Sequence, residues 1–140
     1  MTSTASSLLR NTLRADAAVC AVAGIDLVAF SGMAADLLGL QPGPTLPIVG
    51  IGLLAYAAYL VVASRREPLS LTEAWACATG DLAWIVVSAA LIAFGPLSST
   101  GNWIVGMVAV VVLAFAELKM LGIRRIRQAQ PRMALRHEAA

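Results

Sequence analysis

Long apolar runs alternate with short polar breaks along the chain, and this alternation predicts helices joined by turns. The apolar runs cover about residues 14–32, 46–63, 71–94 and 103–123. A helix needs roughly 20 apolar residues to cross the ~30 Å hydrocarbon core of a bilayer, and all the runs are near that length or above it. The breaks contain proline and glycine, which end helices, and they read "QPGPTLP", "SRREPLS" and "GPLSSTGN". The pattern therefore predicts an all-α fold, a four-helix transmembrane bundle.

Two local patterns refine the helix boundaries. The stretch "MAADLLGL" at residues 33–40 combines apolar residues with Asp36, so it either extends the first helix or lies along the membrane interface as a short amphipathic segment. Ser70 and Glu73 have the spacing of a capping box, in which each side chain binds a free amide at the start of a helix. This box predicts that the third helix begins near Leu71.

Composition agrees with a membrane protein and narrows the possible functions. Of the 140 residues, 59% are hydrophobic and 13% are charged, whereas an average soluble domain is about a quarter charged. The four runs leave no room for a separate soluble domain, so residues 1–140 are predicted to form a single integral membrane domain. We find no C-x-x-C, HExxH, nucleophile elbow, phosphate loop or nucleic-acid module. We therefore expect no cofactor, no metal and no nucleic-acid partner, and an enzyme is the class least favoured.

Basic residues are distributed asymmetrically among the predicted loops. All ten fall on the side of the two termini and the middle loop: Arg10, Arg14, Arg65, Arg66, Lys119, Arg124, Arg125, Arg127, Arg132 and Arg136. The loops on the other side, residues 33–45 and 95–102, contain none. Because cytoplasmic loops are enriched in Lys and Arg, both termini are predicted to be cytoplasmic. Within the basic tail, residues 124–140, the side chains of Arg124, Arg125 and Arg127 are candidates to contact anionic lipid headgroups; the alternative is that the tail only sets the topology.

The two halves of the chain resemble each other weakly. "DAAVCA" at residues 16–21 matches "EAWACA" at 73–78, and "PIVG" at 47–50 matches "WIVG" at 103–106. A true duplication would make the bundle a parallel 2+2 repeat about the membrane normal. Chance matches between alanine-rich segments are the alternative.

Two aspartates are predicted to lie near the membrane midplane. At ~1.5 Å of rise per residue, Asp26 and Asp81 lie roughly 18 and 16 Å from the basic edge, and Tyr56 lies roughly 14 Å from it. An ionised carboxylate at the bilayer centre costs ~2.5–3.5 kcal/mol, so both aspartates are expected to face the bundle interior. No basic residue is predicted at their depth, so we expect them to be protonated, to accept hydrogen bonds from Tyr56, Tyr59 or Trp84, or to share a proton with each other. Asp16 is expected to pair with Arg14 at the interface, and Lys119 to extend toward the headgroups.

Polar and small residues form one stripe on each predicted helix. The stripe of the third helix is the clearest, with Glu73, Cys77, Asp81, Trp84 and Ser88. The others are Asp16, Cys20, Gly24, Leu27 and Ser31; Gly52, Tyr56, Tyr59 and Ala63; and Gly106, Val110, Leu113 and Glu117. Together with depth, these stripes define a candidate intramembrane polar site: Asp26, Asp81, Tyr56, Tyr59, Trp84, Ser88 and Glu117.

Four segments carry a resemblance to known proteins. They are "LRADA" at residues 13–17, "SRREP" at 64–68, "GDLAWIVVSAAL" at 80–91 and "FAELKMLGIRR" at 115–125. In these segments the chain resembles a group of small four-helix proteins of the bacterial inner membrane. The resemblance implies a multi-pass bundle in that membrane and implies no activity.

Three functions agree with these patterns. The first is a non-enzymatic accessory or scaffold subunit that packs with itself or with a larger membrane complex, its polar stripes locking the helices together. The second is a small proton- or cation-coupled transporter or channel in which Asp26 and Asp81 bind the ion. The third is a bundle that binds an apolar ligand between its helices.

Overall fold

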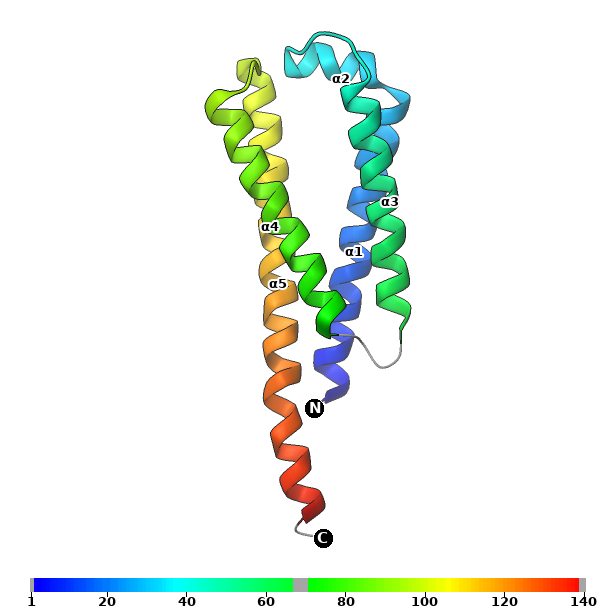
Figure 1. The fold of residues 1–140 in the computed structure, drawn as a ribbon, viewed down its shortest axis with the longest axis vertical. Helices are drawn as coiled ribbons and strands as arrows, with labels where there is room; N and C mark the ends of the chain where they lie inside the picture. Colours follow the sequence, from blue (N-terminus) through cyan, green and yellow to red (C-terminus); the bar gives the residue numbers. More distant parts are fainter. Residues whose placement is uncertain (1, 67–70, 139–140) are drawn as a thin grey trace.

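The protein consists of α-helices in the part of the chain that the structure describes. The computed structural model describes residues 2–66 and 71–138, with side chains described for 7–66 and 71–128. Five helices follow one another (Figure 1): α1 (Thr2–Ala29), α2 (Ser31–Leu38), α3 (Thr45–Arg65), α4 (Leu71–Phe94) and α5 (Ser99–Glu138). No strand occurs among these residues. The all-α prediction is therefore confirmed.

Three of the helices, α3, α4 and the Ser99–Gln128 part of α5, are each long and apolar enough to cross a membrane. The first span passes the same test only when α1 and α2 are taken together, and these two helices meet at an angle of 96°. The chain therefore has three candidate spans, or four if the bent pair counts as one.

The predicted helix boundaries agree with the structure to different degrees. The third predicted run, residues 71–94, has the bounds of α4. The first helix begins well before residue 14, and the basic tail continues α5 without a break to Glu138. Ser70 lies outside the described residues, so the capping box is untested; the Glu73 carboxylate forms an ion pair with the Arg66 guanidinium, at an N–O distance of 2.6 Å.

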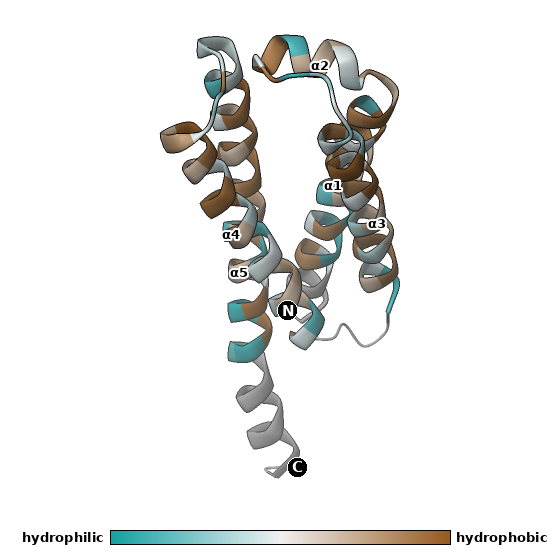
Figure 2. Ribbon diagram, turned by 45° about the horizontal axis from the view of Figure 1, so that its top comes forward, coloured by the Kyte–Doolittle hydropathy of each residue, from teal (hydrophilic) through white to brown (hydrophobic). Residues whose placement is uncertain are grey.

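Large apolar side chains cover the outer surface of the helices. Phe94 is 91% exposed, Trp103 74% and Val86 68%, and hydrophobic residues predominate along α3 and along much of α4 and α5 (Figure 2). A soluble monomer rarely exposes a contiguous apolar surface of this kind. The exposed surface is therefore that of a multi-pass membrane protein, whose solvent is the bilayer.

Helix α2 turns away from α1 and reaches the start of α5 at the end of the bundle opposite to the termini (Figure 1). It ends at Gly39, which takes a left-handed conformation with φ of 75°. The Ser98 amide donates to the Leu38 carbonyl at 2.8 Å, and the Ser98 hydroxyl donates to the Leu37 carbonyl at 3.0 Å. Of the two predictions for residues 33–40, a separate short helix is confirmed and an extension of the first helix is wrong.

The long helices form two pairs, α1 with α3 and α4 with α5. Between the pairs, α1 packs extensively against α5, whereas α3 and α4 touch at only a few positions. A 2+2 repeat would make these two contacts equivalent, so the structure does not confirm the repeat.

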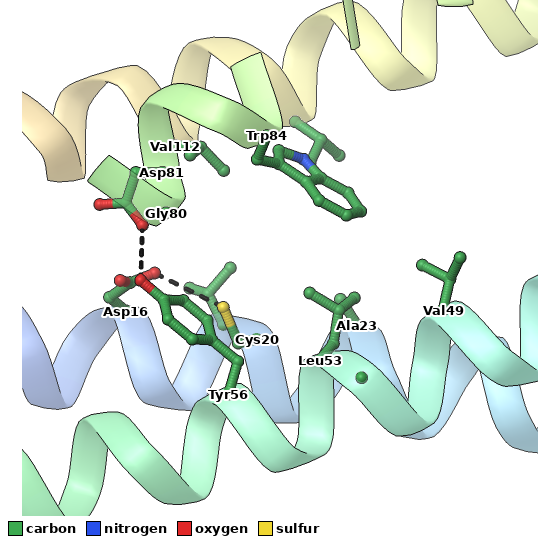
Figure 3. Close-up of a pocket in the computed structure, with 13 residues that line it drawn as sticks. Asp16, Cys20, Ala23, Val49, Leu53, Tyr56, Gly80, Asp81, Trp84 and Val112 are labelled. Carbon is green, nitrogen blue, oxygen red and sulfur yellow. Dashed lines mark hydrogen bonds between the residues drawn. The ribbon is translucent and has the colours of Figure 1, made fainter. Parts of the chain in front are cut away.

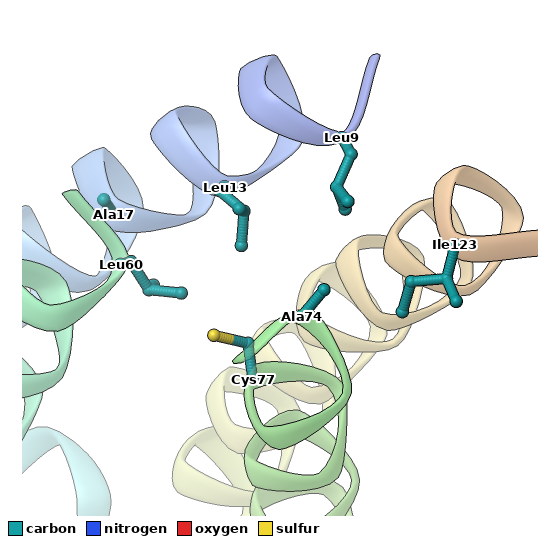
Figure 4. Packing of buried hydrophobic residues seen from close by; sticks show 7 residues of the cluster. All are labelled: Leu9, Leu13, Ala17, Leu60, Ala74, Cys77 and Ile123. Atoms are coloured by element: carbon teal, nitrogen blue, oxygen red, sulfur yellow. The ribbon is translucent and has the colours of Figure 1, made fainter. Parts of the chain in front are cut away.

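A small apolar core joins the two pairs near the termini. It comprises Leu9, Leu13, Ala17, Leu60, Ala74, Cys77 and Ile123, which come from all four long helices (Figure 4). Residues from all four helices meet in this cluster, so this end of the bundle is closed by tight packing.

Candidate functional site

A buried lysine lies at the centre of the bundle's polar interior. The Lys119 side chain, on α5, is fully buried. Its Nζ atom forms ion pairs with the carboxylate of Asp16 on α1 and with Oδ2 of Asp81 on α4, the latter at 2.6 Å. The two aspartates are 1% and 3% exposed. We call these three residues the charged triad; it links the α1/α3 pair to the α4/α5 pair.

Tyr56 on α3 extends the triad to the fourth long helix. Its hydroxyl oxygen lies 3.0 Å from Oδ1 of Asp81 and 3.0 Å from the carbonyl oxygen of Cys77. A hydroxyl has a single proton, so Tyr56 donates to one of these acceptors at a time. On the other aspartate, the Cys20 thiol approaches Oδ1 of Asp16 with a sulfur–oxygen distance of 3.6 Å. All four long helices thus contribute to one polar network.

Helical periodicity explains how α5 places Lys119. Ala116, Lys119 and Ile123 follow one another at spacings of three and four, and each is fully buried. Residues at these spacings share one face of a helix, and this face packs against α1 and α4. A helical Cα–Cβ bond tilts toward the helix N-terminus, which here is the end near α2. The lysine side chain therefore points deeper into the bundle rather than toward the tail.

A cavity of about 350 Å³ lies next to the charged triad, between the two helix pairs. Asp16, Asp81 and Tyr56 form one end of it, and the walls are mostly apolar, with Ala23, Leu53 and Val112 among the lining side chains (Figure 3). All four long helices line the cavity, and part of its boundary is open. Its shape suits a molecule with an apolar body and one polar end.

The predicted stripe of α4 is confirmed, and so is the inward position of Asp81. Cys77, Asp81 and Ser88 are buried, and Trp84 is half-buried. Trp84 lines the cavity, where its ring extends between the helix pairs (Figure 3), and its buried Nε1 has no hydrogen-bond partner. Ser88 is not among the lining residues.

Three predicted site residues lie outside the polar interior, and their predicted inward orientation is wrong. Asp26 is exposed, because Gly24 faces α3 and a step of two residues turns a helix by about 200°. Tyr59 is 40% exposed, since α3 buries the neighbouring face that carries Leu60. Glu117 is exposed as well.

The prediction that no basic residue reaches the depth of the aspartates is also wrong, as is the pairing of Asp16 with Arg14. Arg14 is exposed, whereas Asp16 is buried against Lys119. The predicted stripe of the fourth span ends at Glu117, whereas the buried face of α5 carries the preceding residue, Ala116. No signal in the sequence of α5 separates the face of Ala116, Lys119 and Ile123 from the face that carries Glu117, because both faces are apolar.

The arginines proposed to contact lipid headgroups lie on the outside of α5. Arg124, Arg125 and Arg127 are all exposed. The guanidinium carbon of Arg127 lies 6.0 Å from the centre of the Trp75 ring, which is within the range of a cation–π interaction. Their positions are compatible with headgroup binding, which stays a prediction.

The comparisons with known proteins identify no relative. No family model, no curated protein and no solved structure matches the chain. Among the side chains that the structure describes, no group of three or more His, Cys, Asp or Glu is placed to hold a metal ion. The charged triad and its cavity are therefore interpreted from their own chemistry.

Proposed function

We propose that this protein is a non-enzymatic, membrane-embedded binding protein that takes up a small amphipathic molecule between its two helix pairs. The observation that supports the proposal is the cavity of about 350 Å³, with apolar walls and a polar end made by Asp16, Asp81 and Tyr56. Binding sites for small molecules are typically concave, mostly apolar, and have a few polar groups that orient the ligand. The third function predicted from the sequence is thus the one that the geometry favours.

The position of the cavity also supports this proposal. Protein interiors are normally packed as densely as organic crystals, and the core residues near the termini are almost completely buried. The cavity begins beside the charged triad and is bordered by Trp84, whose indole N–H is unpaired. A ligand would fill the space between the pairs.

Filling the cavity should weaken binding without disturbing the fold. Gly52 lines the cavity, and a Cβ atom added there meets no atom within 4 Å, so a leucine side chain can extend into the space. In a variant with Trp75→Phe and Trp103→Phe, Trp84 is the remaining tryptophan. We expect the neutral probe N-phenyl-1-naphthylamine to quench its fluorescence saturably in lipid nanodiscs. Gly52→Leu should weaken this saturable binding at least about fivefold.

Gly32→Leu is the matched control for this experiment. Gly32 on α2 likewise has no atom within 4 Å of an added Cβ, and it does not line the cavity. Its substitution should leave the titration unchanged. Saturable quenching of equal affinity in the Gly52→Leu variant, or no saturable quenching in the parent, would rule out the proposed function.

The proposed location is the bacterial inner membrane, with four spans, α1 and α2 together forming the first, and with both termini in the cytoplasm. Apart from the buried Lys119, the other nine basic residues fall in the segments near the termini and in the middle loop, which supports this orientation because positive charge is retained on the cytoplasmic side. A C-terminal fusion to green fluorescent protein should fluoresce, and a C-terminal fusion to alkaline phosphatase should be inactive. The opposite pair of results would reverse the orientation.

A structural role within an oligomer or a larger membrane complex is the second candidate. It is favoured by the charged triad, in which Lys119 pairs with both Asp16 and Asp81 and so joins the two helix pairs. Under this hypothesis the polar interior serves to hold the bundle in one arrangement. Two results together would favour the structural role over the binding function: a loss of stability when the triad is altered, and a cavity that binds no probe.

A further inference from the structure

We infer that the occupant of the cavity is a lipophilic organic cation, an amine or onium group on an apolar body, whose positive charge lies at the end formed by Asp16 and Asp81. This inference rests on the proposed function and specifies its ligand. It follows from the arrangement of charges around the cavity, which is not symmetric.

Among the side chains that the structure describes, two carboxylates and no cationic group border the cavity. Asp16 and Asp81 are both lining residues, whereas Lys119, which pairs with them, is not. With all three ionised, the triad has two negative charges and one positive charge. The other polar groups nearest to this end, the Tyr56 hydroxyl and the Cys20 thiol, belong to residue types that are neutral near pH 7. The triad therefore carries a formal charge of −1, and both of its aspartates line the cavity.

Asp16 has the greater spare capacity to accept a cation. One oxygen of Asp81 accepts from Lys119 and the other lies 3.0 Å from the Tyr56 hydroxyl. For Asp16, one oxygen accepts from Lys119, and the other is approached only by the Cys20 thiol at 3.6 Å, which is a weak donor. Because each carboxylate oxygen has two lone pairs, Oδ1 of Asp16 is the atom that a ligand ammonium would meet.

The remaining wall of the cavity is also suited to a cation. The Trp84 ring borders the same space (Figure 3), and indole is the aromatic side chain that attracts cations most strongly through its face. An unbalanced negative charge is costly in a medium of low dielectric constant, so a ligand cation is favoured there and a ligand anion is repelled. Apolar walls then exclude small hydrated inorganic ions and select an apolar cation.

Two probes of matched shape and opposite charge test this inference directly. Tetraphenylphosphonium and tetraphenylborate differ in the sign of their charge, and each can be titrated against the neutral probe bound in the cavity. Both ions also dissolve in lipid. The affinity of each ion for the cavity is therefore taken from the part of the displacement signal that disappears in the Gly52→Leu variant. We expect the phosphonium ion to displace the neutral probe at least about tenfold more effectively than the borate ion does.

Removing one negative charge should remove this preference. Asp16→Asn keeps an oxygen acceptor for Lys119 and makes the triad formally neutral, so the ratio of the two affinities should fall toward one. Asp81→Asn provides a second variant if the first fails to fold. Asp26→Asn is the control: it removes the same charge from an exposed position outside the cavity, and the preference should persist.

The outcomes separate this inference from the function on which it rests. Equal displacement by both ions, stronger displacement by borate, or no displacement by either while the neutral probe still binds would overturn the inference and leave the cavity as a binding site. Failure of all three probes would overturn the binding function itself. Repeating the titration in nanodiscs of phosphatidylethanolamine identifies the source of the cation. A lower affinity for the phosphonium ion would mean that the ammonium group of the lipid competes for the site. An unchanged affinity would assign the site to a free organic cation.

Discussion

Replacing Lys119 with methionine should destabilise the protein by about 3–5 kcal/mol, the cost typical of removing one partner from a buried ion pair. Lys119 is fully buried, and its ammonium group is paired with both Asp16 and Asp81. Methionine fills a similar volume, so the loss of packing is small. The variant would instead leave two carboxylates close together in the bundle interior without a cation, and they must either take up protons or separate the helices that carry them.

The measurement is reversible unfolding in mixed micelles, with helix content followed by circular dichroism as the denaturing detergent increases. Arg125→Met is the matched control, because it removes one positive charge from the same helix at an exposed position; we expect a change within about 0.5 kcal/mol. A loss of similar size in both variants would contradict a specific role for the triad.

A compensated variant separates charge from shape. Lys119→Met combined with Asp16→Leu and Asp81→Leu removes all three charges while keeping similar volumes, and buried ion pairs replaced as a unit by apolar residues of similar volume are often neutral or stabilising. We expect this triple variant to recover most of the stability that Lys119→Met loses. If it is no more stable than the single variant, the interaction that matters is not electrostatic.

The sequence predicted the helices and much of α4, because these depend on local properties. Apolar runs bounded by proline and glycine located the spans, and the spacing of Cys77, Asp81 and Ser88 identified the buried face of α4. The corresponding stripe on α1 was also oriented correctly, since Asp16 and Gly24 are both buried. The buried polar residues of α4 mark its inward face, whereas on α1 the exposed Asp26 shows that a polar residue alone does not.

The sequence did not predict the triad, and the reason lies in the bilayer. In a soluble protein, polar residues mark the outer face of a helix, but here both faces of α5 are apolar, so periodicity carries little information. Glu117 and Lys119 differ in phase by about 200°, and nothing in α5 alone decides which of them faces inward. Depth was equally misleading for Lys119, because its long side chain points away from the tail. The choice depends on the carboxylates of α1 and α4, which are distant in sequence.

Gly50→Leu should separate α1 from α3 and destabilise the protein by about 1–3 kcal/mol, the usual cost of overpacking. A Cβ atom added at Gly50 would lie 2.8 Å from the carbonyl oxygen of Gly24 and 2.9 Å from Cγ2 of Val28. The first of these is a backbone atom, which cannot rotate away, so the helices must move. Close approach between small residues drives helix association in membranes, and α1 and α3 form the most extensive helix contact in the bundle.

Gly52→Leu provides an internal control two residues further along α3, where an added Cβ meets nothing within 4 Å. Both substitutions replace glycine with a good helix former, which by itself favours the helix by roughly 0.5–1 kcal/mol. The same unfolding assay should therefore show Gly52→Leu as neutral or stabilised and Gly50→Leu as destabilised. If the two variants unfold alike, the α1–α3 contact is not determined by the Gly24–Gly50 approach. Because Gly52→Leu is also the variant that fills the cavity, its retained stability would show that any binding it loses comes from occupied space and not from a damaged fold.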